Sequence, residues 1–411
     1  MLSIGSIVSS IIIVSFLEFC QISVETFIEI VKNIWWLPLV WTPLLTSAIV
    51  FVTIKFAPGT AGSGNQQIKL VLDDNCTSVI REKFVSIKVA VFKYFLTAAG
   101  FFAGLSIGRE GPTVQIASSL MYTLKKFLPS NSKFTSKFLI SVGGAIGLAV
   151  AFKAIIAGTV FALEESAETI KRESRVTYFS LIALSIITCF VLVDFDPFYT
   201  YVTMPTITTS IILPILITIV FSSVLGGLFA KSLLSTMPNN KTILGRFKKQ
   251  HPILLAGTLG LIIAIIGILG NGITYSDGYN YTKEIILKDQ EFSLFFVPLK
   301  FIATWFTAWT GVPAGMFSPL LSIGAGIGKT ISEILIVDSK LLILCGMVGF
   351  LSSVIRAPLT AGFLAIEVLG AYNMIPLALL VSFLSDKISH HISPPLWLTQ
   401  KKILLNNEIK K

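Results

Sequence analysis

Long apolar runs follow one another from one end of the chain to the other. Of its 411 residues, 54% are hydrophobic and 13% are charged, and the mean hydropathy is +0.82. A soluble protein carries about 25% charged residues. We therefore predict an all-α, multi-pass membrane protein. The runs predict helical segments at 4–19, 36–56, 86–107, 112–128, 136–165, 177–195, 208–235, 253–270, 292–310, 319–336, 341–368 and 374–389.

The basic residues gather in short loops and at the C-terminal end. A net charge of +10 would suit a nucleic-acid partner, but its distribution follows the positive-inside rule instead. Segments 17–33 and 190–206 are acidic and are expected outside. We expect the basic loops and both termini in the cytoplasm, membrane lipid around the chain, and no nucleic acid. The basic positions are Lys125, Lys126, Lys133, Lys137, Lys171, Arg172, Arg175, Arg246, Lys248, Lys249 and the tail 401–411.

Metal and enzyme chemistry find little support. The four cysteines are scattered without metal-ligand spacing, and the three histidines form no HExxH pair. We expect no metal site and no cofactor. An intramembrane enzyme with Ser63 as nucleophile would need a base, but the histidines lie far along the chain, near loops or ends. The chain is therefore not expected to be an enzyme.

Two sequence elements recur in the same order. The pattern GxxxP occurs at 108–112 and 315–319, an offset of 207 (315 − 108). Segment 153–164 lines up with segment 356–367, an offset of 203 (356 − 153), with glutamate ending both. Such repeats, with broken helices in matching places, point to a transport site where the repeats meet. We expect a first repeat at 1–206, a second at 207–397 and a short basic cytoplasmic tail at 398–411.

Glycine and proline mark three helix starts that could hold an anion inside the membrane. They are Ser63-Gly64, Gly111-Pro112 and the segment 315–319. Unpaired N–H groups and the helix dipole at such starts attract an anion without a bare positive charge that would trap it. Glycine permits close backbone approach, and the Ser63 hydroxyl adds a donor. The repeated frame favours a site over three unrelated loops.

Glu110 is the strongest single candidate for a functional residue, because it is a carboxylate within apolar sequence. A carboxylate inside a membrane is costly and is by default a functional hypothesis. It can exchange protons and, when ionised, imitate an anion. The alternative is a structural ion pair with Arg109.

These residues also carry a family resemblance. The strings KFAPGTAGSG (55–64), GREGPTVQIA (108–117), GMFSP (315–319) and RAPLTA (356–361) resemble the CLC family of chloride channels and chloride–proton exchangers. The resemblance implies a homodimer with one pore in each subunit, built from inverted repeats of short, tilted, broken helices. It implies chloride ligands at Ser63, at the backbone N–H groups of Met316 and Phe317, and at the central aromatic, here Trp397. Glu110 falls on the family's gating glutamate.

The choice between exchanger and channel depends on a second glutamate. Glu165 stands where family exchangers carry an inner proton-transfer glutamate, whereas channels usually have an apolar residue there. An acidic pair such as Glu164-Glu165 at a helix end is also ordinary. We expect a coupled chloride/proton antiporter, with a passive voltage- or pH-gated chloride channel of the same fold as the alternative. A fluoride exporter is disfavoured by Ser63.

The sequence departs from the family pattern in three places. Asn65 and Gln66 replace the isoleucine and proline that follow the GSG string, and Ile155 stands where proline is usual. Trp397 replaces the family's tyrosine. Its indole N–H can donate to an anion but cannot accept, and the alternative is an interfacial belt residue.

Two further expectations concern Lys93 and the end of the chain. Lys93 is expected either beside Glu110 or reaching to the interface. The sequence ends at Lys411, soon after Trp397, so no cytoplasmic regulatory domain is expected. By resemblance this favours a bacterial inner-membrane protein.

Overall fold

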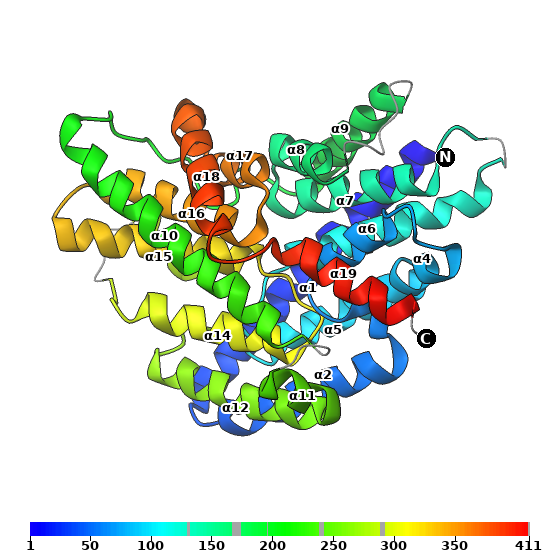
Figure 1. Ribbon diagram of the computed structural model, residues 1–411, viewed down its shortest axis with the longest axis horizontal. Coiled ribbons are helices and arrows are strands. Elements are labelled where there is room, and N and C mark those ends of the chain that lie inside the picture. Colours follow the sequence, from blue (N-terminus) through cyan, green and yellow to red (C-terminus); the bar gives the residue numbers. More distant parts are fainter. Residues whose placement is uncertain (130–131, 167–173, 195, 238–241, 288–291, 410–411) are drawn as a thin grey trace.

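The computed structural model describes residues 1–129, 132–166, 174–194, 196–237, 242–287 and 292–409, and it is helical throughout (Figure 1). Within these ranges the extended contacts are two isolated bridges, with no strand. Six of the described helices are long and apolar enough to cross a membrane. The predicted all-α, multi-pass membrane fold is confirmed.

The helices vary widely in length, and many are too short to span a bilayer upright. They are α1 (Leu2–Asn33), α2 (Pro38–Phe56), α3 (Asn65–Val71), α4 (Ser78–Phe84), α5 (Ile87–Phe102), α6 (Glu110–Thr123), α7 (Ser136–Phe152), α8 (Ile155–Ser166), α9 (Arg175–Leu192), α10 (Thr209–Ser235), α11 (Ile243–Gln250), α12 (Pro252–Leu269), α13 (Tyr279–Leu287), α14 (Phe296–Thr310), α15 (Phe317–Leu335), α16 (Ser339–Ile355), α17 (Pro358–Leu369), α18 (Ile375–His390) and α19 (Leu396–Ile409).

Several helices of the first and second halves of the chain lie on different sides of the molecule. In Figure 1, α4 and α6 to α9 occupy one side of the molecule, and α10 with α15 to α18 occupies the other. Helices in matching places of the two halves contact one another: α2 packs on α12, α8 packs on α17, and the start of α6 touches α15. The last helix, α19, crosses to the first half and packs on α3, where Lys401 pairs with Asp73. The tail expected at 398–411 is thus mostly a docked helix.

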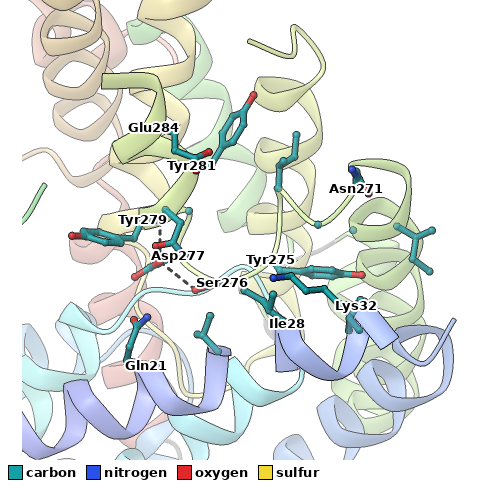
Figure 2. Close-up of a pocket in the computed structure, with 18 of the residues that line it drawn as sticks. Gln21, Ile28, Lys32, Asn271, Tyr275, Ser276, Asp277, Tyr279, Tyr281 and Glu284 are labelled. Atoms are coloured by element: carbon teal, nitrogen blue, oxygen red, sulfur yellow. Dashed lines mark hydrogen bonds between the residues drawn. The ribbon is translucent and has the colours of Figure 1, made fainter. Parts of the chain in front are cut away.

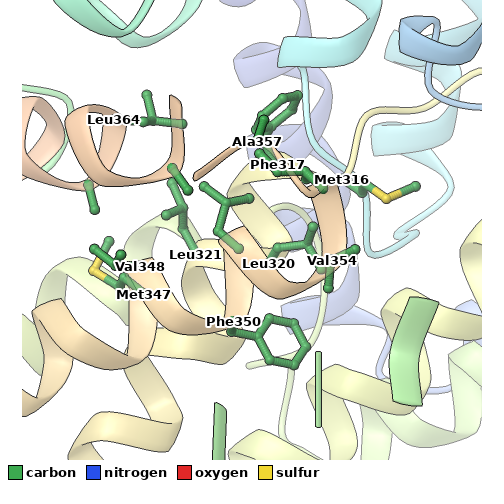
Figure 3. Close-up of a cluster of buried hydrophobic side chains, with 14 of the residues drawn as sticks. Met316, Phe317, Leu320, Leu321, Met347, Val348, Phe350, Val354, Ala357 and Leu364 are labelled. Atoms are coloured by element: carbon green, nitrogen blue, oxygen red, sulfur yellow. The ribbon is translucent and has the colours of Figure 1, made fainter. Parts of the chain in front are cut away.

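Part of the largest apolar core cluster lies at α15, α16 and α17. Apolar side chains from the three helices interlock there, with Leu321, Met347 and Leu364 among them (Figure 3). Phe317, at the start of α15, is fully buried in the same cluster. The start of α15 is therefore held rigidly, which matters because it faces the centre of the molecule.

Several helices begin where a hydroxyl side chain accepts a backbone hydrogen bond. Thr77, Ser86, Thr135 and Thr242 each precede a helix and accept from the N–H three positions later, at 3.1–3.4 Å. Each bond satisfies one of the N–H groups left free at a helix start. These caps help set where α4, α5, α7 and α11 begin.

The single segments expected at 136–165 and 341–368 are wrong, because each is two helices. The first breaks at Lys153 and the second at Arg356, where φ is 54° and 59°. A residue in this left-handed conformation ends a helix even when the apolar pattern continues. The two break positions differ by 203 (356 − 153), which is the offset seen in the sequence.

The other differences concern extent. The run expected at 4–19 continues to Asn33, through the acidic stretch. In α1, Ser6 and Ser10 donate to backbone carbonyls of α9 at 2.6 and 2.9 Å, so small residues let the two helices approach closely. The short helices α3, α4, α11, α13 and α19 were not expected, because their apolar runs are too short to stand out from loops.

Candidate ion-binding site

Three helix starts converge at the centre of the molecule, as the sequence predicts. Gly108 and Gly315, one from each GxxxP element, exchange two backbone hydrogen bonds of 2.8 Å. Gly62 donates from its N–H to the carbonyl of Val312 at 3.1 Å. The loops before α3, α6 and α15 therefore form one irregular layer, buried in protein where such backbone is tolerated.

Glycine is required where two of these loops touch. Gly64 has φ of 104°, and a Cβ atom there would lie 2.7 Å from the carbonyl oxygen of Gly111. A Cβ atom on Gly111 would collide with the carbonyl oxygen of Ser63. Both positions were predicted as site residues for close backbone approach, and the structure brings them into direct contact.

Ser63 is buried and keeps its hydroxyl hydrogen available. Its Oγ accepts from the backbone N–H of Asn65 at 3.3 Å and from the Asn65 side chain at 3.1 Å. A hydroxyl has two acceptor positions and one donor. With the acceptors engaged, the O–H is oriented away from Asn65 and can donate to an anion. Asn65, a departure from the family pattern, thus fixes the serine.

Glu110 is the first residue of α6, and its carboxylate lies at the start of α15. Oε1 accepts from the hydroxyl of Ser318, and Oε2 accepts from the backbone N–H of Ser318 at 3.4 Å. The side chain is 1% exposed. An ionised carboxylate is thereby placed where a helix N-terminus would bind a free anion.

Glu110 does not form the alternative ion pair with Arg109. Arg109 extends away and pairs with Asp277 at 3.2 Å, with a longer contact to the carbonyl of Leu17 at 3.4 Å. Both partners of the ion pair are nearly buried, with side chains 11% and 5% exposed.

Three further predicted ligands lie at or beside the start of α15. Met316 and Phe317 begin α15, and the Phe317 ring packs on Phe152, Phe161 and Trp397 at centroid distances of 6.2, 6.4 and 5.5 Å. As a side chain Phe317 is therefore packing. Trp397 is 1% exposed, so the belt alternative is wrong. Its indole N–H has no partner among the described residues.

Lys93 lies neither beside the interface nor against a carboxylate. It is fully buried, and its Nζ donates to the carbonyls of Thr60 and Gly62 at 2.8 and 2.5 Å. These carbonyls belong to the loop that carries Ser63. Lys93 therefore positions the predicted anion loop, and both expectations for it are wrong.

A small cavity of about 60 Å³ adjoins Ser63 and Met316. Lys248 of α11 also lines it and, among the described lining residues, is the one with an ionisable side chain. Burial lowers the pKa of Lys248 to about 8. Within the described part of the chain it has no carboxylate partner, so its charge is available to an anion in the cavity.

The second predicted proton residue, Glu165, lies near the end of α8, but its side chain is outside the described residues. Its neighbour Glu164 is described and has a structural task. Glu164 accepts from the N–H groups of Leu359 and Thr360, at 3.0 and 2.8 Å, at the start of α17.

Sequence reasoning missed Ser318, Asp277 and Lys248. Ser318 lies within the GMFSP string and could have been found from it. Asp277 and Lys248 lie in or beside short helices that gave no clear signal, and their proximity to the site depends on the fold.

Known proteins resemble this chain in sequence. The family model described as voltage gated chloride channel matches residues 45–390. A curated relative, the H(+)/Cl(-) exchange transporter ClcA of Vibrio parahaemolyticus, is 26% identical over 361 residues, which are 82% of this chain and 74% of the relative.

Solved structures share the fold. A slow cyanobacterial Cl-/H+ antiporter matches with a TM-score of 0.82 and 21% identity, covering 98% of this chain and 97% of that one. A CLC-type fluoride/proton antiporter matches with a TM-score of 0.77 and 20% identity, covering 95% and 96%. A eukaryotic CLC transporter matches with a TM-score of 0.74 and 20% identity, covering 97% of this chain and 72% of that one.

Proposed function

Because this chain belongs to the voltage gated chloride channel family, we propose that it exchanges chloride for protons across a membrane. The observation that carries the proposal is the Glu110 carboxylate held at the start of α15. A group that both titrates and occupies an anion position couples the two ions. The curated relative named above is an exchange transporter for the same pair of ions.

The exchange cycle follows from the charge of Glu110. When ionised, the carboxylate is held by the N–H groups and dipole of α15 and closes the path to anions. When protonated, it loses that attraction, swings away and leaves the helix start free for chloride. Each proton bound thus admits an anion, and each anion that returns to the helix start competes with the carboxylate.

The proposed chloride ligands come from the helix starts and from two side chains. The Ser63 hydroxyl and the indole N–H of Trp397 supply side-chain donors. Backbone at Gly64, Gly111, Met316 and Phe317 supplies the helix starts. Each attracts chloride without a full positive charge that would hold it too tightly to be released.

Glu165 is proposed to exchange protons with the cytoplasm. A proton travelling on a water-lined anion path would leak, so the two routes must part before the inner face. Glu165 lies near the C-terminal end of α8, after the largely apolar stretch of that helix, and the positive-inside pattern puts this end toward the cytoplasm. Its place in sequence supports this role, since family exchangers carry a glutamate there.

We further propose a homodimer in a bacterial inner membrane with both termini in the cytoplasm. The family resemblance supports the dimer, and the positive-inside pattern supports the orientation. Tags at the two ends should be accessible from the cytoplasmic side of cells alone.

The experiment that tests the function is reconstitution into liposomes with a chloride gradient and no initial pH gradient. An exchanger drives protons uphill as chloride runs down, and the pH inside the vesicles changes. A protein that passes chloride without moving protons is instead the passive channel. Repeating the assay with fluoride tests the preference that Ser63 indicates.

A further inference from the structure

The loop before α13 repeats the backbone of the loop that carries Ser63. Gly62 and Gly64 have φ of 74° and 104°, and Ser276 and Gly278 have φ of 62° and 83°. Both pairs share an offset of 214 (276 − 62 and 278 − 64), and the helices that follow, α3 and α13, begin at the same offset. The left-handed conformation is uncommon for a non-glycine residue such as Ser276.

A buried lysine holds each of the two loops in the same way. Lys93 and Lys300 are both fully buried, and their offset of 207 (300 − 93) equals that of the GxxxP elements. Each donates to two backbone carbonyls of its own loop. The carbonyls are those of Thr60 and Gly62 for Lys93, at 2.8 and 2.5 Å, and those of Thr274 and Ser276 for Lys300, at 3.0 and 2.7 Å.

At the position equivalent to Ser63 the second loop carries Asp277 (277 − 63 = 214). Its Oδ1 accepts from the N–H of Tyr279 at 3.0 Å, and its Oδ2 pairs with Arg109 at 3.2 Å. Arg109 directly precedes Glu110. The first loop therefore presents the neutral hydroxyl of Ser63. The second presents the carboxylate of Asp277, which forms an ion pair with Arg109, the residue before Glu110.

The pair between Arg109 and Asp277 lies between two cavities. Asp277 lines a cavity of about 680 Å³, where it faces Gln21 of α1 (Figure 2). Arg109 lines a second cavity of about 300 Å³, and Gln21 and Tyr279 line both. The second cavity is bordered by residues of 17–33 and 190–206, the two segments that the charge pattern places outside.

We propose that Asp277 is a positioning residue that masks the charge of Arg109 at the outer approach to Glu110. An unmasked arginine at this point attracts anions more strongly and releases them more slowly. Masking keeps the full charge of Arg109 from holding anions at this approach. This inference rests on the proposed chloride transport.

The test compares chloride flux by purified protein in liposomes at increasing chloride concentration. Asp277→Ser is the main variant because serine fills the same place in the matching loop and can still cap α13. It should lower the apparent KM for chloride by roughly three- to tenfold. It should also lower the maximal rate, because release slows. Asp277→Glu retains the charge and should stay near the wild type.

Glu284→Gln is the matched control. Glu284 is an exposed carboxylate that lines the same large cavity. Unlike Asp277, it forms no ion pair with Arg109 or with any other described residue. Its removal should leave KM unchanged. Equal shifts in Glu284→Gln and Asp277→Ser would mean a general charge effect and would overturn the proposal.

Two other outcomes would also overturn it. A lower maximal rate with unchanged KM in Asp277→Ser would mean a structural role alone. If neither Asp277→Ser nor Asp277→Asn folds, as judged by gel filtration, the role of Asp277 is likewise structural alone. If the wild type itself carries no chloride, the proposed function fails instead, so the two failures are distinguishable.

Discussion

Glu164 and Glu367 each cap the helix that carries the other. Glu164, on α8, accepts from the N–H groups of Leu359 and Thr360 at the start of α17. Glu367, on α17, accepts from the N–H groups of Ile156 and Ala157 at the start of α8, at 3.0 and 2.6 Å. The crossed caps link the two predicted repeats by a reciprocal contact.

The two capped helix starts differ in their first residue. Ile155 begins α8 where proline is usual, and Pro358 begins α17 at the matching place. Proline suits a helix start because it needs no partner for a missing N–H. A carboxylate binds the next two N–H groups at both helix starts, so the cap forms with proline at α17 and without it at α8.

The crossed caps predict a shared loss of stability. Glu164→Gln and Glu367→Gln each put an amide NH2 against backbone donors, so each should lower the free energy of unfolding by about 1–3 kcal/mol. Because both caps support the α8–α17 interface, the double variant should lose less than the sum. Unfolding of the purified protein in detergent measures this. Strict additivity would show that the two caps act independently.

Glu110→Gln should stop proton movement while chloride flux persists and loses its dependence on pH. The amide cannot ionise, so it is not held at the start of α15 as the carboxylate is. Liposome flux at several pH values, with protons and chloride recorded together, measures both effects. Glu110→Asp serves as the control, because it still titrates and should keep a pH dependence. Continued proton pumping by Glu110→Ala would remove Glu110 from the mechanism.

Glu165→Val should leave chloride flux largely intact while uncoupling protons. Valine removes the titratable group without affecting the Glu164 cap. Glu164→Gln is the comparison, since the loss of a cap should reduce both fluxes together through stability. The ratio of proton to chloride flux separates the two cases. An unchanged ratio in Glu165→Val would show that the inner proton step lies elsewhere.

The centre of the candidate site could be predicted from the sequence because its signals are local. Glycine, proline and a carboxylate in apolar sequence mark Ser63, Glu110 and the start of α15 without knowledge of the fold. Partners that are backbone groups leave no such mark. Lys93 binds two carbonyls, and Glu164 binds N–H groups in the other half of the chain, so neither role could be inferred. The helix breaks at Lys153 and Arg356 were missed because left-handed residues there are not glycine.

Lys248 should give chloride transport a pH dependence of its own. Its pKa is lowered to about 8, so its charge is present below that pH and is lost as pH rises through it. Apparent chloride affinity at the cavity beside Ser63 should therefore fall above about pH 8, by roughly two- to fivefold for a partly exposed charge. Chloride flux measured between pH 6 and pH 9, at intervals of about one pH unit, should reveal this fall in affinity as a step.

Variants of the two neighbouring lysines isolate this effect. Lys248→Arg stays charged and should lose the step while keeping high affinity, whereas Lys248→Gln should have low affinity throughout. Lys249→Gln is the matched control, because Lys249 is exposed and does not line the cavity. A step that survives in Lys248→Arg would assign it to another group.

Trp397→Phe should weaken chloride binding while leaving the fold in place. Phenylalanine keeps a ring against Phe317, 5.5 Å away between centroids, but removes the indole N–H. That N–H is buried and has no partner among the described residues, which is costly unless a ligand accepts from it. A hydrogen bond to a charged acceptor contributes about 1.5–3 kcal/mol, so affinity should fall about tenfold or more. Trp397→Tyr restores a donor and should recover part of the loss. Calorimetric titration of the purified protein with chloride measures the affinities, and equal binding by Trp397→Phe and wild type would leave Trp397 a packing residue.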